Sequence, residues 1–314
     1  MAQVYRLTDE DIFSISTGAL ATCLAPGASV CFGVFDGVHV GHQFLIEQCA
    51  ATAMDSGPSV ILTFDRDPDE LFHAERLKKL MGNEQRIAAL SRCDVDAVVV
   101  LPFTRRFADL APHEFLDSVF AGAGIAHLHV GCDLRFGCRA SGTVDDLASW
   151  MLAHHVQLHA HELLARDGLP VDSTRIRQEL ALGHVEKANE LLGHFYAFIG
   201  EVRPGCGRGT DMGFATANLH IEPMLRVLGD GVYAAYVMVG DTRYKAAVSV
   251  GVPPTFDDVI ANSEVHILDY SGDLVGCTIE VLFTHWLRPM MKFPSVDELI
   301  ETVMGNIEWV RENL

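Results

Sequence analysis

The feature that most constrains the fold is a short apolar run that passes through a glycine turn into a helical pattern. Ser29–Phe32 is apolar and β-leaning, and residues 41–54 alternate polar and apolar side chains at helical spacing. We therefore predict a strand, a tight turn and a helix start. This geometry directs backbone N–H groups and the positive end of a helix dipole at one point, where an anion such as a nucleotide phosphate can bind.

Two histidines lie in the predicted turn. His39 and His42 are three residues apart with Gly41 between them, so both imidazoles can face a bound phosphate and stabilise charge on a pentavalent phosphorus. Gly37 and Gly41 leave room for the close backbone approach that a phosphate needs. The alternative is chance, because the chain has 15 histidines and a short motif alone is only a hypothesis.

In the first part of the chain, short apolar runs alternate with helical stretches after a segment, residues 1–28, that carries little information. The expected strands are Ser29–Phe32, Ser59–Phe64, Ala97–Leu101, His127–Gly131 and Val156–His161, and the expected helices run up to Asp55 and over Asn83–Ser91, Pro112–Ala121 and Asp145–Leu152. This alternation predicts an α/β domain with a parallel sheet and right-handed crossovers. Ligands of such sheets bind at the carboxyl ends of the strands.

The periodicity changes after a connecting helix at Val185–Leu192. The expected strands there are Tyr196–Val202, Thr216–Ile221, Val232–Val239, Tyr244–Val250, Glu264–Tyr270 and Cys277–Phe283. Closely spaced short strands predict a compact antiparallel barrel, and a capping box at Ser295 starts a closing helix. We place the two domains at residues 1–186 and 187–314.

The charge balance limits the partners. The chain has 23 Lys and Arg against 42 Asp and Glu, a net charge of −19, which argues against nucleic acid or a membrane as a partner. Positive charge for a phosphate must therefore be local, and the candidates are Arg175, Arg177, Arg208 and Arg288. The eight cysteines form no Cys-x-x-Cys pair, and we find no signal peptide or apolar run of about 18 residues. We expect reduced thiols in a cytoplasmic protein.

The string Phe35-Asp36-Gly37-Val38-His39-Val40-Gly41-His42-Gln43 resembles the signature of the nucleotidylyltransferase superfamily and, in this longer form, its bacterial FAD synthetase branch. That branch is the N-terminal half of the bifunctional riboflavin kinase/FAD synthetase family. The resemblance implies that His39 and His42 are catalytic. It also implies that Gly33, Phe35, Asp36 and Gly41 bind the nucleotide.

The resemblance covers roughly residues 29–312 through at least six motifs in family order. It implies a Rossmann-like nucleotidylyltransferase domain followed by a six-stranded antiparallel β-barrel with a terminal helix. The barrel would phosphorylate riboflavin to FMN with ATP. The N-terminal domain would join FMN to the AMP part of a second ATP and release pyrophosphate. The implied ligands are ATP, riboflavin, FMN and FAD, with Mg²⁺ bound to ATP, and we expect a monomer or weak homo-oligomer.

Two further motifs belong to the N-terminal domain. The loop over residues 130–137 resembles the family loop that lines the flavin and nucleotide pocket, which makes Asp133 and Phe136 candidate flavin ligands. The alternative for Asp133 is a carboxylate that caps its own turn.

The run Asp172-Ser173-Thr174-Arg175-Ile176-Arg177 predicts a helix whose first turn carries hydroxyl and guanidinium groups, an anion-binding arrangement. It resembles the family motif Ser-Ser-Thr-x-Ile-Arg, with Asp172 in place of the first serine. The resemblance implies that Ser173 and Thr174 bind ATP phosphates and that Arg177 is catalytic, while Asp172 points away as a cap.

In the barrel, a glycine loop precedes the sequence Gly213-Phe214-Ala215-Thr216-Ala217-Asn218. The two together resemble the riboflavin kinase signature. Thr216 and Asn218 are two apart on a strand, so they point to the same side and can offer two oxygens to Mg²⁺ bound to ATP. The loop glycines that would cover the phosphates are Gly205, Gly207 and Gly209.

The segment Glu264-Val265-His266 resembles the family sequence that contains the general base. Glu264 would take the proton from the riboflavin 5′-hydroxyl as it attacks the γ-phosphorus. The alternative is an exposed carboxylate at a strand edge. We expect His266 to be structural.

The chain departs from the family pattern in several places. Thr210 and Pro253 replace arginines, Ser249 replaces an asparagine, and Arg66-Asp67 replaces Pro-His in a Pro-His-Pro loop. These departures leave open a paralogue with a weakened kinase half, a flavin-binding regulator without turnover, and a transferase for another phosphorylated metabolite.

Overall fold

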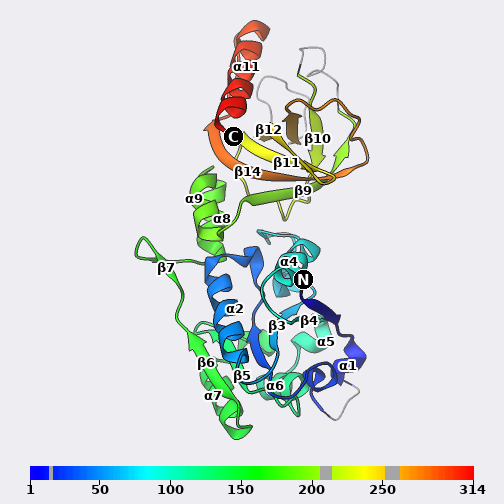
Figure 1. Ribbon diagram of the computed structural model, residues 1–314, viewed down its shortest axis with the longest axis vertical. Coiled ribbons are helices and arrows are strands. Elements are labelled where there is room, and N and C mark those ends of the chain that lie inside the picture. Colours follow the sequence, from blue (N-terminus) through cyan, green and yellow to red (C-terminus); the bar gives the residue numbers. More distant parts are fainter. Residues whose placement is uncertain (14–16, 206–213, 252–261) are drawn as a thin grey trace. The chain divides into compact units, whose positions relative to one another are not determined.

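Figure 1 shows the computed structural model, which describes residues 1–13, 17–205, 214–251 and 262–314. The chain divides into two compact units. The first comprises Met1–Leu77 and Met81–Asp172, and the second comprises Lys78–Leu80 and Ser173–Leu314. The two units divide between Asp172 and Ser173, which is before the domain boundary expected at residue 186. The expected boundary therefore stays a prediction.

The first unit is built on a six-stranded sheet in the order β1-β4-β3-β2-β5-β6, and all pairs are parallel. The strands are β1 (Gln3–Arg6), β2 (Ser29–Phe32), β3 (Ser59–Phe64), β4 (Ala97–Leu101), β5 (His127–Gly131) and β6 (Gln157–His161). The chain runs from β2 outward to β3 and β4, and then returns to place β5 on the other side of β2. This reversal makes the carboxyl ends of β2 and β5 the switch point where ligands of open α/β sheets bind.

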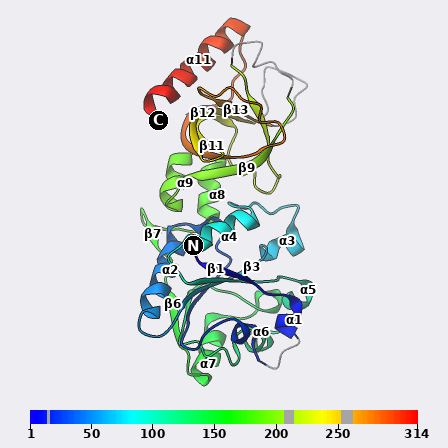
Figure 2. The same ribbon diagram turned by 45° about the vertical axis from the view of Figure 1, so that its right-hand side comes forward.

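Helices cover both faces of this sheet (Figures 1 and 2). The helices of the first unit are α1 (Asp9–Phe13), η1 (Ala19–Thr22), η2 (Asp36–Val38), α2 (Val40–Ala53), α3 (Pro68–His73), α4 (Asn83–Ser91), α5 (Arg105–Ala108), α6 (Pro112–Phe120), η3 (Cys138–Ala140) and α7 (Val144–Ala153). Successive strand residues point to opposite faces, so Phe32 joins a core with α5, α6 and α7, while Cys31 joins one with α2 and α4. Burial on both faces explains why the strands β2, β3 and β4 are mostly apolar.

The predicted α/β architecture is confirmed, but the segment before residue 29 carries more structure than expected. It contains β1, which pairs with β4 at the edge of the sheet, together with α1 and η1. The four residues of β1 are mostly exposed, so no buried stripe marked the strand. The short helix α3 and the hairpin of β7 (Ala165–Arg166) and β8 (Leu169–Pro170) were also not anticipated.

In the second unit, a closed antiparallel barrel has the strand order β10-β13-β12-β11-β14-β9. Its elements are α8 (Ser173–Ala181), α9 (Val185–Leu192), β9 (Tyr196–Arg203), β10 (Ala217–His220), β11 (Gly231–Val239), β12 (Thr242–Gly251), β13 (Asn262–Ile267), β14 (Thr278–Arg288) and α11 (Val296–Asn313). Ile307 and Val310 of α11 pack on Phe214, Ala234 and Leu268 outside the barrel (Figure 2). The predicted six-stranded barrel with a terminal helix is confirmed.

Four histidines form a ladder on β5 and β6. His127 Nδ1 lies 3.1 Å from His159 Nε2, and His129 Nδ1 lies 3.0 Å from His161 Nε2. The Nε2 of His129 is 2.8 Å from the Thr52 hydroxyl on α2. Each N–H···N bond needs one protonated and one bare nitrogen, so the ladder favours neutral rings. Burial, followed by repulsion from the other three histidines, lowers the pKa of His129 to about 3.

We expect this ladder to destabilise the first unit in acid. Between the unfolded pKa of 6.5 and the folded value of about 3, the unfolded chain binds a proton at His129 that the folded chain does not, so stability falls as pH falls. From pH 7.5 to 5 the loss is roughly 2 kcal/mol. Urea unfolding at both pH values measures this loss of unfolding free energy. In His129→Gln the part of the loss that comes from His129 should disappear. An equal pH dependence in variant and wild type would contradict the prediction.

Candidate active sites

The turn after β2 has the predicted strand–turn–helix form and an unusual backbone. Phe35 and Val38 have φ values of 60° and 42°, and Gly37 between them has a φ of 80°. Left-handed φ is costly for bulky side chains and gathers at functional sites. The turn lies at the switch point of the sheet, where an α/β ligand is expected.

The structure brings the two predicted histidines together at the start of α2. The His39 and His42 rings stack with centroids 3.6 Å apart and planes inclined by 19°. His39 is the N-cap of α2, and its Nδ1 accepts a hydrogen bond from the His42 backbone N–H at 3.3 Å. In neutral His39 the proton is therefore on Nε2. A Cβ on Gly41 would lie 3.2 Å from the His39 ring, so glycine makes this stack possible.

The surroundings of His42 keep its ring neutral. Burial, and then repulsion by His39 and Arg86, hold the pKa of His42 well below its ordinary value. Within the described part of the chain, its Nδ1 is buried and has no hydrogen-bond partner. A buried polar atom of this kind is costly unless something binds to it. This orphaned nitrogen marks the turn as a place for a ligand.

Other predicted nucleotide ligands of the turn have buried side chains. Phe35 is 1% exposed and its ring covers Gly33, where a Cβ would approach the ring to 3.3 Å. Asp36 is also buried, and its carboxylate accepts a hydrogen bond from the Met81 backbone N–H at 3.3 Å. Nucleotide binding by these residues stays a prediction, and their backbone groups are the better candidates.

The predicted flavin loop follows β5, next to β2 at the switch point. Asp133 is exposed, and its carboxylate folds back over Gly131. Phe136 is buried instead, with its ring 5.3 Å from that of Phe115 in the aromatic core. Asp133 therefore keeps its position as a candidate ligand, whereas the Phe136 side chain is occupied by core contacts.

The second anion-binding motif begins α8, as the sequence predicted. Arg177 donates a hydrogen bond from Nη2 to the Thr174 hydroxyl at 3.1 Å, so these two candidate residues lie together. The helix from Ser173 belongs to the second compact unit. Its role in adenylyl transfer stays a prediction.

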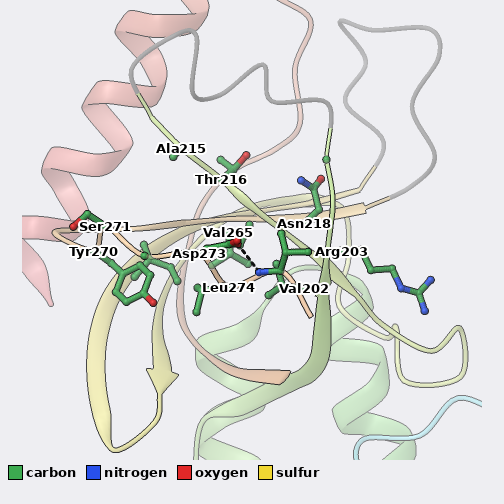
Figure 3. Close-up of a pocket in the computed structure, with 15 residues that line it drawn as sticks. Val202, Arg203, Ala215, Thr216, Asn218, Val265, Tyr270, Ser271, Asp273 and Leu274 are labelled. Atoms are coloured by element: carbon green, nitrogen blue, oxygen red, sulfur yellow. Dashed lines mark hydrogen bonds between the residues drawn. The ribbon is translucent and has the colours of Figure 1, made fainter. Parts of the chain in front are cut away.

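A pocket of about 470 Å³ opens on the barrel (Figure 3). The residues around it are Val202, Arg203, Gly205, Ala215, Thr216, Ala217, Asn218, Val265, Ile267, Tyr270, Ser271, Gly272, Asp273, Leu274 and Val275. Thr216 and Asn218 rise from the same side of the chain in Figure 3. A Cβ on Gly205 would collide with the Asn218 side chain. The pocket therefore unites the predicted metal ligands with the first glycine of the loop.

Glu264 lies directly opposite Asn218 in the antiparallel β10–β13 pair and opposite Ser249 in the β12–β13 pair. Side chains directly opposite in such a pair share a face, with Cβ atoms about 5 Å apart. Val265 and Val248 are fully buried, while Glu264 and Ser249 are partly exposed. The predicted base is therefore beside Asn218, one of the two predicted metal ligands, on the outer face of the barrel.

His266 supports the start of β10. Its Nδ1–H donates to the Ala215 carbonyl oxygen at 2.8 Å, next to Thr216, in agreement with a structural role. Ser249, one of the departures from the family pattern, has its hydroxyl 3.7 Å from the Met290 sulfur. The candidates Gly207, Gly209, Arg208, Thr210 and Pro253 lie outside the described residues.

Sequence reasoning missed two groups near the sites. The loop Tyr270–Val275 lines the barrel pocket, and a turn of polar and glycine residues after a strand was its only signal. The buried Arg86 on α4 donates hydrogen bonds at the ends of β2 and β3, and no pattern distinguished it from a surface arginine.

The metal-binding potential of the described residues is limited. Among them, no group of three or more His, Cys, Asp and Glu side chains could hold a metal ion. The hydroxyl of Thr216 and the amide oxygen of Asn218 are hard donors that suit Mg²⁺, an ion that takes its remaining ligands from phosphates and water. These residues fit a metal that arrives with ATP.

Comparison with known proteins establishes the class of protein. The chain is a two-domain transferase: residues 23–175 match the family model for FAD synthetase, and residues 192–314 match that for riboflavin kinase. It is 33% identical to the bifunctional riboflavin kinase/FMN adenylyltransferase of Listeria monocytogenes, over 85% of this chain and 86% of that protein. It is 32% identical to the protein of that name in Pseudomonas fluorescens, over 91% and 92%.

The chain therefore belongs to the bifunctional riboflavin kinase/FMN adenylyltransferase family, whose members make FMN and FAD. A crystal structure described as a macrolide-efflux protein from Streptococcus pneumoniae shares the fold over 99% of both chains, with 30% identity and a TM-score of 0.82. In the described ranges of the present chain, no helix is long and apolar enough to cross a membrane. Both halves of the predicted enzyme are present, and the comparisons lend no support to a paralogue with one activity or to a regulator.

Proposed function

We propose that adenylylation of FMN takes place at the turn between β2 and α2. The observation that carries this assignment is the stacked His39–His42 pair, with its orphaned His42 Nδ1, at the switch point of the sheet. A phosphate oxygen of FMN attacks the α-phosphorus of ATP, and pyrophosphate leaves. FMN is already a nucleophile, so the chain needs only to align the reactants and stabilise charge.

The chain's own groups supply this stabilisation. In neutral His39 the proton is on Nε2. This N–H can donate a hydrogen bond to a phosphoryl oxygen while Nδ1 keeps its capping bond from the His42 backbone N–H. The N-terminus of α2 adds backbone N–H groups and a positive dipole end. Arg177 and Thr174 are the proposed partners from α8.

For the kinase reaction, we propose the pocket of Thr216 and Asn218, with Glu264 as the general base. Mg²⁺, when bound with ATP, would draw charge from the phosphates, and Thr216 and Asn218 would hold it. Glu264 takes the proton of the riboflavin 5′-hydroxyl, and the resulting oxygen attacks the γ-phosphorus of ATP; the bond to the β–γ bridging oxygen breaks and ADP leaves. The cross-strand pairing of Glu264 with Asn218 supports this arrangement. The apolar lining residues Val265, Ile267 and Leu274 suit the adenine base.

One reaction series tests both assignments. With riboflavin, ATP and Mg²⁺, the chain should make FMN and then FAD, and with FMN supplied it should make FAD directly. Chelation with EDTA should stop both reactions, and added Mg²⁺ should restore them, because ATP phosphates need the ion. Chromatography that measures FMN and FAD separately gives the result. Formation of FAD from FMN without FMN from riboflavin would instead support a weakened kinase half.

Three further assignments belong to the proposal. The catalytic domains divide at residues 186 and 187, between the two family matches at 175 and 192. The protein works in the cytoplasm, which agrees with the free thiol state of the seven cysteines in the described ranges. It acts as a monomer or weak homo-oligomer, and neither nucleic acid nor membrane is a partner.

A further inference from the structure

Arg86 on α4 is a cation buried inside the first unit. It is 1% exposed, and its guanidinium donates hydrogen bonds to two backbone carbonyl oxygens and one hydroxyl. Burying a charge is costly, and a neutral side chain could fill the same space. The charge therefore calls for an explanation beyond core filling.

The guanidinium joins the carboxyl ends of two neighbouring strands. Its Nη1 donates to the Val34 carbonyl oxygen and to the Thr63 hydroxyl, both at 2.7 Å, and its Nη2 donates to the Phe64 carbonyl oxygen at 2.7 Å. Thr63 in turn donates to Val34 at 3.3 Å. Val34 follows β2, and Thr63 and Phe64 end β3. These acceptors lie at the carboxyl ends of the two strands, where the histidine turn begins.

A short path leads from Arg86 to the histidine pair. Val34 precedes Phe35, whose left-handed backbone turns the chain. The Phe35 ring lies edge-on to the His42 ring, with centroids 5.2 Å apart. Arg86 also acts through its charge, because its repulsion is one of the causes that lower the pKa of His42.

We propose that Arg86 is a positioning residue for adenylyl transfer: its hydrogen bonds hold the start of the turn that carries His39 and His42, and its fixed positive charge acts on that pair. This inference rests on the proposed reaction at His39 and His42. A cation at this depth is shielded from solvent, so its field reaches the phosphate site with little screening.

The charged groups around the pair are few. His39 is stacked on His42, and repulsion by His39 and by Arg86 adds to the effect of burial in lowering the pKa of His42. The carboxylates that act on Arg86 are Asp36, Asp67, Glu70 and Asp65, and their attraction opposes the effect of burial on its pKa. Burial is the larger influence, and it lowers the pKa of Arg86. The guanidinium nevertheless stays charged at neutral pH.

Two variants separate charge from hydrogen bonding. Arg86→Gln keeps an amide donor for the carbonyls but removes the charge, whereas Arg86→Lys keeps the charge and loses the planar fork. FAD formation from FMN is measured between pH 5 and 9. In Arg86→Gln we expect kcat/KM to fall at least about tenfold and the acidic limb of the profile to move to higher pH, because His42 gains its proton more easily. In Arg86→Lys we expect the acidic limb at the same pH as in the wild type and most of the wild-type kcat/KM.

The controls distinguish this inference from the proposed function. If the wild type forms no FAD, the assignment of the reaction itself is wrong. If the wild type forms FAD and Arg86→Gln shows an unshifted acidic limb, Arg86 is only structural and the inference is overturned. FMN formation from riboflavin in the same chain reports on intact protein. Should Arg86→Gln fail to fold, a shifted limb or a rate loss beyond about tenfold in Arg86→Lys would overturn the inference.

Discussion

Replacing His42 with alanine should abolish the formation of FAD from FMN while the formation of FMN from riboflavin continues. The His42 ring stacks on His39 at 3.6 Å and carries a buried, unpartnered Nδ1. Removing a preorganised donor from a phosphoryl-transfer site costs roughly 10²- to 10³-fold in kcat. Rates with FMN and with riboflavin as separate substrates measure the two activities in one preparation.

The same experiment on His39 needs a different substitution, because His39 caps α2 as well. Alanine would remove the cap and cost about 1 kcal/mol of helix stability. His39→Asn keeps a capping side chain and removes the imidazole, so a loss of FAD formation there reports on chemistry. His113, an exposed histidine on α6, provides the matched control as His113→Ala. Wild-type FAD formation in both His42→Ala and His39→Asn would contradict the proposed site.

The central strands could be predicted because both of their faces are buried under helices. Every residue of β2, β3 and β4 is buried, so each appears as a mostly apolar run that only Ser29, Ser59 and Thr63 interrupt. The edge strand β1 lacks such a run, because most of its residues face solvent. The histidine turn was predictable for another reason: the motif is local, and its glycines and imidazoles act within a few residues of one another.

The parts that escaped prediction depend on contacts between distant residues. Sequence order does not reveal that Phe136 packs against Phe115, or that Asp36 accepts a hydrogen bond from Met81. Arg86 reaches across 52 positions to Val34, and its residue type alone predicts a solvated helix face. The Tyr270–Val275 loop joins the pocket only because the barrel closes through β9 and β10. Local sequence motifs were enough to predict the two reactions. Contacts between residues far apart in the sequence determine which of the predicted side chains remain accessible.

Replacing Glu264 with glutamine should abolish FMN formation from riboflavin while FAD formation from supplied FMN stays at its wild-type rate. Glutamine keeps the size of the side chain and its place opposite Asn218, but it cannot accept the proton of the attacking hydroxyl. Loss of a general base costs roughly 10²- to 10⁴-fold. Glu201→Gln on the exposed part of β9 is the matched control.

The response of the remaining activity to Mg²⁺ adds a second criterion. Glu264→Gln should not recover when the Mg²⁺ concentration is raised, because the group it lacks is a base and not a metal ligand. Asn218→Ala should behave differently: it removes the oxygen proposed to hold the metal, so a higher Mg²⁺ concentration should recover part of its rate. Recovery of Glu264→Gln by Mg²⁺ would show that Glu264 holds the ion rather than the proton, and the proposed base would be wrong.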